Sequence, residues 1–264
     1  MISRLKRYRL RYLLKGSKVI VEPGGILQID PDVQILNSVI YVGSGGTLKL
    51  ASNSVLREST VYIAGPGSQA EVGSECSVSN ADLAVWKGRF VLGSYSFIEN
   101  GGIGRKVRIS IDGSCVIGTF NRIRAALWVR FGGVLSIGSR NAINERTEIR
   151  CDEQVDIGDY NQISYECTIW DTNTHCLYHP ERRREVTDSQ YPDFGFETER
   201  PLTSPVKIGS DCWLGKGSTL LKGSVIEDRC VVGYGTLISG KHISAESKVV
   251  SKSVLSVSPI ESWE

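Results

Sequence analysis

Net charge, histidine and long apolar runs are all scarce in this 264-residue chain. The formal net charge is only +2, so the composition does not indicate a nucleic acid as the partner of the whole chain. No run of about 18 apolar residues occurs, so no transmembrane helix is expected. The N-terminus, "MISRLKRYRLRYLLKG", lacks an uninterrupted apolar core and does not resemble a secretory signal. We therefore expect a cytoplasmic protein.

Cysteine pairs are also missing. The seven cysteines are an odd number without a CxxC motif, which argues against a disulfide framework and against a zinc ribbon. We expect free thiols in a reducing compartment.

What the chain does contain is a repeat of six residues. Apolar residues recur every sixth position from Ile208 to Ile238, and a small residue follows four positions after each of the first five. Shorter runs with the same spacing begin at Ile111, Ile137 and Ile157, and a less regular one follows Val72, Val78, Ala84 and Phe90. A period of six fits neither an α-helix nor a simple hairpin sheet and is typical of a parallel β-helix.

This repeat predicts an all-β fold, with three units in each triangular coil of about 18 residues. The apolar and the small residues point inward, so most cysteines are expected to be core thiols rather than reactive groups. These are Cys76, Cys115, Cys167, Cys212 and Cys230, and Cys176 is interpreted as a bystander. We expect a basic segment at 1–16, irregular coils at 17–105, regular coils at 106–250 and a tail at 251–264.

The repeat is interrupted between Ile169 and Val206 by a long polar excursion, at about 170–205. It begins with "TIWDTNTHC", which places one of only three histidines, His175, at its base. A β-helix does not need such a loop for stability, and long loops in compact folds are commonly functional. The alternative is a tolerated insertion at a solenoid edge.

At this point residues 137–240 resemble the hexapeptide-repeat acyltransferases of the galactoside, maltose and polysaccharide O-acetyltransferase type, which fold as a left-handed parallel β-helix. The resemblance is carried by "DTNTH", by "AINERTEI" and "VDIGDYNQIS" before the excursion, and by "SPVKIGSDCWLGKGSTLLKGSVIEDRCVVGYGTLISGKHI" after it. It implies transfer of an acetyl group from acetyl-CoA to a sugar hydroxyl, in the synthesis of a cell-surface polysaccharide.

The resemblance also implies roles for individual residues. His175 matches the general base, for which an imidazole titrating near neutral pH is suited. Matches to the acceptor side are Asn144, Asp152, Asp171 and Asn173, although Asp171 could equally cap a turn. Matches to the coenzyme side are Trp213, Gly215, Lys216, Gly233, Tyr234 and Lys241. In the family a "GVPAK"-like segment covers the adenine, whereas "VVSKSVLSV" here lacks both Gly and Pro.

Three other functions were compared with this one. An amino-sugar N-acetyltransferase shares the fold and the coenzyme, and these residues do not separate it from an O-acetyltransferase. A zinc enzyme of the γ-carbonic-anhydrase kind needs three converging histidines, but His175, His179 and His242 have a different spacing. A solenoid that only binds glycans would lack coenzyme binding.

Two kinds of partner follow. The resemblance implies a homotrimer with active sites between subunits. The basic N-terminal segment 1–16, if helical, would be partly amphipathic and could contact the anionic inner face of a membrane. A solvated tail or a cap on the first coil is an equal alternative for this segment.

Overall fold

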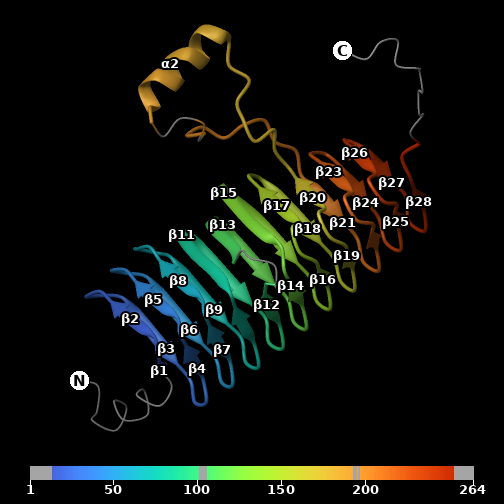
Figure 1. The fold of residues 1–264 in the computed structure, drawn as a ribbon. Coiled ribbons are helices and arrows are strands. Elements are labelled where there is room, and N and C mark those ends of the chain that lie inside the picture. Colours follow the sequence, from blue (N-terminus) through green and yellow to red (C-terminus); the bar gives the residue numbers. More distant parts are fainter. Residues whose placement is uncertain (1–13, 101–105, 193–194, 196, 253–264) are drawn as a thin grey trace, which may run out of the picture.

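The computed structural model describes residues 14–100, 106–192, 195 and 197–252. The chain winds as a parallel β-solenoid with its first and last described coils at opposite ends (Figure 1). Each strand pairs in parallel with strands one coil away, as β14 does with β12 and β16. The predicted left-handed parallel β-helix with a long excursion is confirmed at the level of this architecture. The predicted basic segment at 1–16 lies mainly in residues 1–13, outside the described residues.

The strands form three faces. Face 1 is an 11-stranded sheet. It contains β1 (Leu14–Lys15), β4 (Gln34–Leu36), β7 (Val55–Arg57), β10 (Ser77–Ser79), β12 (Phe97–Glu99), β14 (Arg122–Ile123), β16 (Ala142–Ile143), β19 (Gln162–Ile163), β22 (Trp213–Leu214), β25 (Val231–Val232) and β28 (Lys248–Val249).

Faces 2 and 3 share three long strands that run around the corner between them. These are β11 (Ala81–Leu92), β13 (Val107–Ile117) and β15 (Ala126–Ile137). The other strands of face 2 are β2 (Lys18–Val21), β5 (Val39–Val42), β8 (Thr60–Ile63), β17 (Glu148–Cys151), β20 (Thr168–Trp170), β23 (Thr219–Leu221) and β26 (Leu237–Ser239). The other strands of face 3 are β3 (Ile26–Ile29), β6 (Thr47–Leu50), β9 (Gln69–Val72), β18 (Gln154–Ile157), β21 (Val206–Ile208), β24 (Val225–Ile226) and β27 (His242–Ile243).

We number the corners by the faces that they join. Corner 1 joins faces 1 and 2 and includes 215–218 and 233–236. Corner 2 joins faces 2 and 3 and includes 222–224 and the excursion at 171–205. Corner 3 joins faces 3 and 1 and includes 158–161 and 209–212. Because the cross-section has three sides, corner 3 lies opposite face 2.

The apolar residues of the six-residue repeat fill the interior as predicted. Ile208, Leu214, Leu220, Ile226, Val232 and Ile238 are all buried. The five cysteines predicted to be core thiols are buried and free. Burial raises the pKa of Cys115 to about 12, so its thiol stays protonated and unreactive at neutral pH.

Coil length differs from the prediction in most of the solenoid. Leu214 pairs with Val232, which is the expected step of 18 residues, but Ile143 pairs with Ile163, a step of 20. The irregular run through Ala84 fails, because Leu83 and Val85 point inward instead. The cause is local: only Asn80 separates β10 from β11 at corner 1, so the inward positions Leu83 and Val85 fall five and seven residues after Val78 instead of six.

The predicted boundary near residue 105 lies inside the stack. Strand β12 pairs with β14, and β11 pairs with β13, across it. The division into irregular and regular coils as separate units stays a prediction. Within the described residues, no helix is long and apolar enough to span a bilayer.

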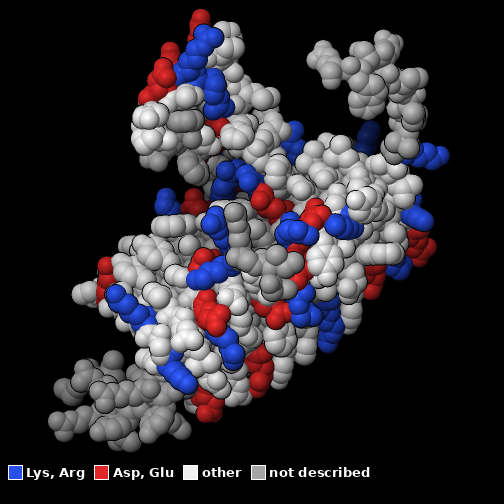
Figure 2. All heavy atoms as spheres, in the orientation of Figure 1, with Lys and Arg blue, Asp and Glu red and all other residues white. Residues whose placement is uncertain are grey.

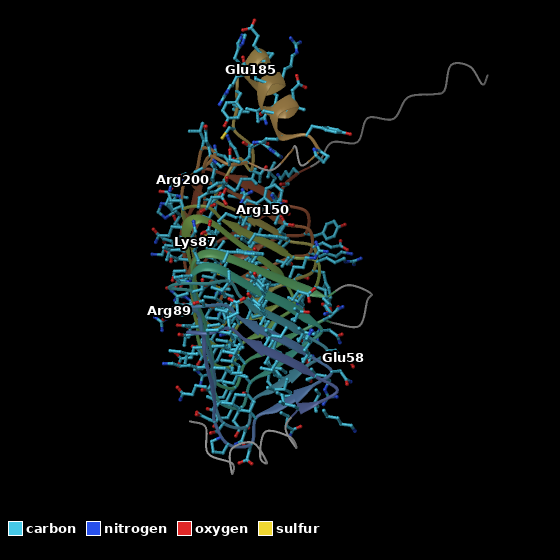
Figure 3. The ribbon with its side chains drawn as sticks, turned by 90° about the vertical axis from the view of Figure 1, so that its left-hand side faces the viewer. Glu58, Lys87, Arg89, Arg150, Glu185 and Arg200 are labelled. Atoms are coloured by element: carbon cyan, nitrogen blue, oxygen red, sulfur yellow. The ribbon has the colours of Figure 1, made fainter. Side chains whose placement is uncertain are left out.

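The excursion stands away from the solenoid at β20 and β21, with helix α2 (Pro180–Gln190) at its outer end (Figure 1). Figure 3 views face 2, with Glu58 of corner 1 on one side, Lys87 of corner 2 on the other and Arg150 between them. In that view the excursion rises above the coils, from Arg200 near its base to Glu185 on α2. The site candidates at corner 2 are therefore carried on a projecting arm.

Candidate functional site

The base of the excursion is a narrow neck of two antiparallel segments. Thr172 and Thr203 form an antiparallel bridge, and the amide of Ser204 donates a 2.9 Å hydrogen bond to the carbonyl of Asp171. The neck fixes where the excursion leaves and re-enters corner 2. It therefore holds the following residues, 173–176, at a defined position relative to the solenoid.

Asp171 uses its carboxylate to cap the adjacent coil. The side chain is fully buried and accepts hydrogen bonds of 2.8, 2.8 and 2.7 Å from the amides of Asp152, Glu153 and Gln154. Burial is the largest influence and raises the pKa of Asp171, while these three hydrogen bonds oppose the rise. This geometry is the turn cap considered as the alternative role, and both carboxylate oxygens are engaged.

Asp152, also expected on the acceptor side, is buried and paired with Arg130. The guanidinium donates from Nε to Oδ1 at 2.8 Å and from Nη2 to Oδ2 at 2.6 Å, a bidentate arrangement. Arg130 keeps part of its surface exposed. The buried carboxylate of Asp152 therefore affects the solvent-facing surface only by positioning Arg130.

His175 lies on the excursion just beyond the neck, with 57% of its side chain exposed. Its Nδ1 lies 2.9 Å from Oε1 of Glu197, whose side chain is only 3% exposed. When Nδ1 carries the proton and donates to the carboxylate, Nε2 is left as a lone-pair acceptor. Within the described residues Nε2 has no hydrogen-bond partner, so the free nitrogen is available to a ligand.

Arg183 of α2 contacts the same carboxylate oxygen of Glu197 as His175 does. Its guanidinium lies 3.3 Å from Oε1 of Glu197 and donates a 2.6 Å hydrogen bond to the carbonyl of Cys176. Burial of Glu197 alone would raise its pKa, but the hydrogen bonds from His175 and Arg183 prevail, and the pKa of Glu197 is lowered. Glu197 is therefore an anion where an imidazole needs one.

The packing of the arm upon itself supports this cluster. Arg183 lies over the ring of Tyr178 at 4.9 Å, and the hydroxyl of Tyr178 donates to Glu199 at 2.9 Å. Thr174, directly before His175, has φ of 65°. A β-branched residue in this region is strained by roughly 1–3 kcal/mol, and such strain gathers at functional sites.

Asn173 contributes to the neck through its backbone, whose amide donates to Leu202 O at 3.0 Å. Its side chain is partly exposed beside His175 in the sequence. Asn144 lies elsewhere, at corner 1, where its Nδ2 donates to the carbonyl of Ile163 at 3.1 Å. The two asparagines expected on the acceptor side are therefore on different edges of the solenoid.

Most of the coenzyme-side residues lie along corner 1. Tyr234 is exposed there, and Lys216 lies 3.4 Å from Glu166. Trp213 is exposed on face 1, at the start of β22 in the preceding coil. Lys241 is exposed but lies at corner 2, at the end of face 2. Face 2 thus separates the coenzyme-side residues at corner 1 from Lys241 at corner 2.

The glycines of corner 1 have a structural explanation of their own. A Cβ on Gly215 would lie 2.8 Å from the amide nitrogen of Tyr234, and one on Gly233 would lie 2.6 Å from Cγ1 of Val250. Coil-on-coil packing therefore requires glycine at both positions. Their presence does not by itself distinguish a coenzyme site from an ordinary coil.

Sequence reasoning missed Glu197 and Arg183. After His175 the excursion offers six carboxylates, at Glu181, Glu185, Asp188, Asp193, Glu197 and Glu199, and no periodicity ranks them. The partner of His175 comes from 22 residues away, which only the folding of the arm determines.

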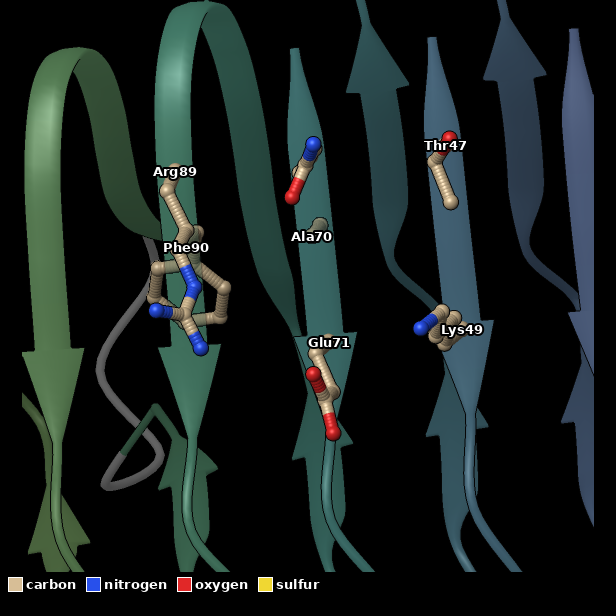
Figure 4. A pocket seen from close by; sticks show the side chains of 7 residues that line it. Thr47, Lys49, Ala70, Glu71, Arg89 and Phe90 are labelled. Carbon is tan, nitrogen blue, oxygen red and sulfur yellow. The ribbon is translucent and has the colours of Figure 1, made fainter. Parts of the chain in front are cut away.

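Other surface features do not compete with this site. A hollow on face 3 lined by Thr47, Lys49, Glu71 and Arg89 (Figure 4) has a volume of about 20 Å³, room for a water molecule but not for a sugar. On the side of the molecule shown in Figure 2, acidic and basic side chains are intermixed. Among the described residues no group of three or more His, Cys, Asp or Glu is arranged to hold a metal ion.

Comparison with known proteins gives a family for the repeat. Residues 205–240 match the model described as bacterial transferase hexapeptide (six repeats). A probable acetyltransferase of Mycobacterium tuberculosis is 29% identical over 147 residues, which cover 53% of this chain and 43% of that protein. The chain therefore spans less than half of the length of this relative.

Three solved structures are also similar. The polySia-specific acetyltransferase NeuO has 15% identity and a TM-score of 0.37, covering 89% of this chain and 80% of its own. LpxA from Acinetobacter baumannii has 17% identity and a TM-score of 0.38, covering 89% and 70%. The polysialic acid O-acetyltransferase OatWY has 15% identity and a TM-score of 0.31, covering 92% and 91%. Similarities this low transfer neither a site nor a substrate.

The repeat region and the relative agree with the motifs that surround the excursion. The matched model covers the coils directly after the arm, from Pro205 to Gly240, and the relative is an acetyltransferase by name. Both support an acyltransferase. Residues 205–240 are therefore similar to the hexapeptide repeats of bacterial transferases.

Proposed function

We propose that this chain is an acetyl-CoA-dependent O-acetyltransferase that acylates a sugar hydroxyl, with His175 as the general base. The observation that carries the proposal is the exposed imidazole of His175, oriented by the buried carboxylate of Glu197. The sugar acceptor, and its place in a cell-surface polysaccharide, rest on the resemblance of the motifs around the excursion.

The role of His175 follows from its two nitrogens. Nδ1 donates to Glu197, so Nε2 can accept the proton of an acceptor hydroxyl and make its oxygen nucleophilic. As the imidazole becomes an imidazolium, the Glu197 carboxylate stabilises the new positive charge. The same imidazolium can then return the proton to the departing thiolate. Arg183 holds the Glu197 carboxylate in place, and the hydrogen bond between Glu197 and His175 is kept.

Acetyl-CoA, when bound, supplies the acyl thioester. The residues at corner 1 and on the adjoining face 1 fit such a ligand: Tyr234 at corner 1 and Trp213 on face 1 are exposed aromatic side chains on neighbouring coils, and Lys216 adds a cation. Aromatic faces suit an adenine ring, and an ammonium group suits phosphates. Lys241 would add a second cation at corner 2.

A trimer joined through face 2 would bring the two edges together. In one chain, face 2 separates the arm at corner 2 from Lys216 and Tyr234 at corner 1, with Trp213 beyond them on face 1. If three copies packed their second faces around a common axis, corner 2 of each chain would meet corner 1 of the next. Face 2 carries outward aromatic side chains, which are enriched in interface cores. These are Tyr41, Tyr62, Trp86, Trp128 and Trp170.

Membrane contact by the basic segment remains part of the proposal. The segment 1–16 carries six Lys and Arg, enough for attraction to anionic lipids at roughly 1 kcal/mol for each charge near the surface. Vesicle sedimentation of the full chain, with and without phosphatidylserine, measures this contact.

The first test is calorimetric titration of acetyl-CoA into the purified protein, because coenzyme binding needs no acceptor. Micromolar binding that is weakened by Trp213→Ala supports the proposal. Absence of binding to a folded protein would favour a solenoid that only binds glycans. The role of His175 as general base is tested next by activity assays with sugar acceptors. His175→Ala is expected to lower kcat by about 10²–10⁴-fold while the affinity for acetyl-CoA is retained.

Complementation tests whether the site spans two chains. His175→Ala and Trp213→Ala are each expected to be inactive. In randomly mixed trimers about a quarter of the sites would pair a native His175 with a native Trp213 from the next chain. Recovery near a quarter of wild-type activity supports an intersubunit site. No recovery, with mixed trimers demonstrated by mass, would place both residues of each site in one chain.

A further inference from the structure

A ladder of stacked rings runs along corner 3, on the side of the solenoid opposite face 2. It consists of Tyr95, Phe120, Arg140 and Tyr160, one from each of four successive coils. The rings of Tyr95 and Phe120 lie parallel with centroids 4.9 Å apart. The guanidinium of Arg140 lies 4.9 Å from the ring of Phe120 and 5.4 Å from that of Tyr160.

The ladder is exposed although its members are large. Tyr95, Phe120 and Tyr160 are 49%, 48% and 54% exposed. Scattered single aromatics on a surface need no explanation, but a contiguous row of them is a feature of binding surfaces. A trimer joined through face 2 would leave this outer edge open to solvent.

Arg140 has no protein acceptor. Within the described residues its guanidinium makes ring contacts but no hydrogen bond or ion pair, unlike Arg122 and Arg229, which pair with Glu99 and Glu246. Its N–H donors therefore remain free at the centre of an aromatic row. A guanidinium held between two rings is pre-organised for a carboxylate.

The backbone beneath the ladder is rigid. Asn121, Asn141 and Asn161 each follow a ladder residue and are buried inside corner 3. Each accepts from the backbone amide one coil on, as when Asn121 Oδ1 accepts from the Asn141 amide at 2.9 Å and Asn141 Oδ1 from the Asn161 amide at 2.8 Å. The ladder is thus presented by a preformed support, which lowers the entropic penalty of binding.

The ladder residues occupy unfavourable backbone positions. Tyr95, Phe120, Arg140 and Tyr160 all have φ between 57° and 61°. The corner imposes this conformation, and Gly, Asn or Asp adopt it at lower cost than an aromatic residue. Neighbouring coils fill the same corner position with Glu75 and Asp211, which end the ladder on either side.

We propose that this corner 3 ladder is a binding track for an acidic polysaccharide, separate from the site at His175. Aromatic faces stack on the apolar C–H faces of pyranose rings, and Arg140 receives a sugar carboxylate between them. At roughly 4.8 Å for each coil, the four rungs extend about 15 Å, so the ligand is a chain segment rather than a single sugar. The identification of the ligand as a glycan rests on the proposed function. A track for a chain segment in turn implies that the acceptor is polymeric.

The test is calorimetric titration of the full chain with three carboxylated polysaccharides, hyaluronate, polygalacturonate and polysialic acid, and with neutral dextran. The test variants are Phe120→Asn and Arg140→Asn, because asparagine tolerates the positive φ and preserves the corner. The matched control is Arg229→Asn, which removes an arginine from the same corner position (φ 57°) outside the ladder.

We expect at least one acidic polymer to bind at least tenfold more tightly than dextran. Phe120→Asn and Arg140→Asn should each weaken that binding tenfold or more, and Arg229→Asn should change it less than twofold. Absence of binding to all three acidic polymers overturns the proposal, as does unchanged binding by both ladder variants. A lower oligomeric mass of Phe120→Asn would also overturn it, because the ladder would then be a contact between copies.

Acetyl-CoA binding, measured on the same samples, separates the two proposals. Polysaccharide binding that depends on the ladder without any acetyl-CoA binding would refute the transferase and leave the track in place. Acetyl-CoA binding without polysaccharide binding that depends on the ladder would leave the transferase proposal in place and overturn the track.

Discussion

Replacing Asp171 by alanine tests whether this residue holds the fold or the acceptor. Its carboxylate receives the amides of Asp152, Glu153 and Gln154 at 2.7–2.8 Å, in a fully buried position. In Asp171→Ala these three donors lose their acceptor. The expected result is therefore loss of stability rather than a selective loss of acceptor binding.

The magnitude follows from how far water can replace the carboxylate. Asp152 is buried, so its amide would stay unsatisfied, at about 1–3 kcal/mol. Glu153 and Gln154 lie closer to the surface, where water can hydrate their amides, and each is expected to add about 0.5 kcal/mol. The free energy of unfolding should fall by about 3 kcal/mol in total. Asp171→Asn keeps one carbonyl oxygen and should lose about 1–2 kcal/mol.

The assay is urea unfolding followed by tryptophan fluorescence, with the change in midpoint compared among variants. Asp188→Ala is the matched control, because this carboxylate is also in the excursion but lies on α2, where no residue is buried. Its effect should stay within about 0.5 kcal/mol. If Asp171→Ala lowered the free energy of unfolding no more than Asp188→Ala does, and also raised the KM for the acceptor, the cap would be refuted. The acceptor contact expected from the sequence would then be restored.

Three further predictions concern the site and corner 1. Glu197→Gln removes the anion beside His175, so kcat should fall at least about tenfold with acetyl-CoA affinity unchanged, as read from steady-state kinetics and calorimetry. Because the pKa of Glu197 is lowered on folding, its stabilising contribution is present above about pH 4.5 and is lost as the pH falls through the lower folded value. The melting temperature of the wild type should therefore approach that of Glu197→Gln as the pH is lowered below about 4.5. Gly215→Ala would place a Cβ 2.8 Å from the Tyr234 amide, so unfolding free energy should drop by about 1–3 kcal/mol, whereas a drop below 0.5 kcal/mol would show that the coils can separate at corner 1.

Much of the fold can be predicted from the sequence because its rule is local. The six-residue spacing from Ile208 to Ile238 assigns each apolar residue to the interior without knowledge of any distant residue, and all of them are buried. The same rule explains the free cysteines. It fails at Ala84, where a corner of only one residue, Asn80, shifts the register after Val78, because a local period has no information about the length of a corner.

The candidate site divides in the same way. The break in the repeat by itself marks the excursion. It also indicates His175, because this residue is one of only three histidines and lies at the base of a long loop. Only the tertiary structure decides that Glu197 is its partner, that Asp171 is buried beneath a turn and that the coenzyme-side residues lie on another edge. The physical reason is that these contacts join residues 17–22 positions apart or on different corners, and their pairing is fixed by how the arm folds and the coils stack.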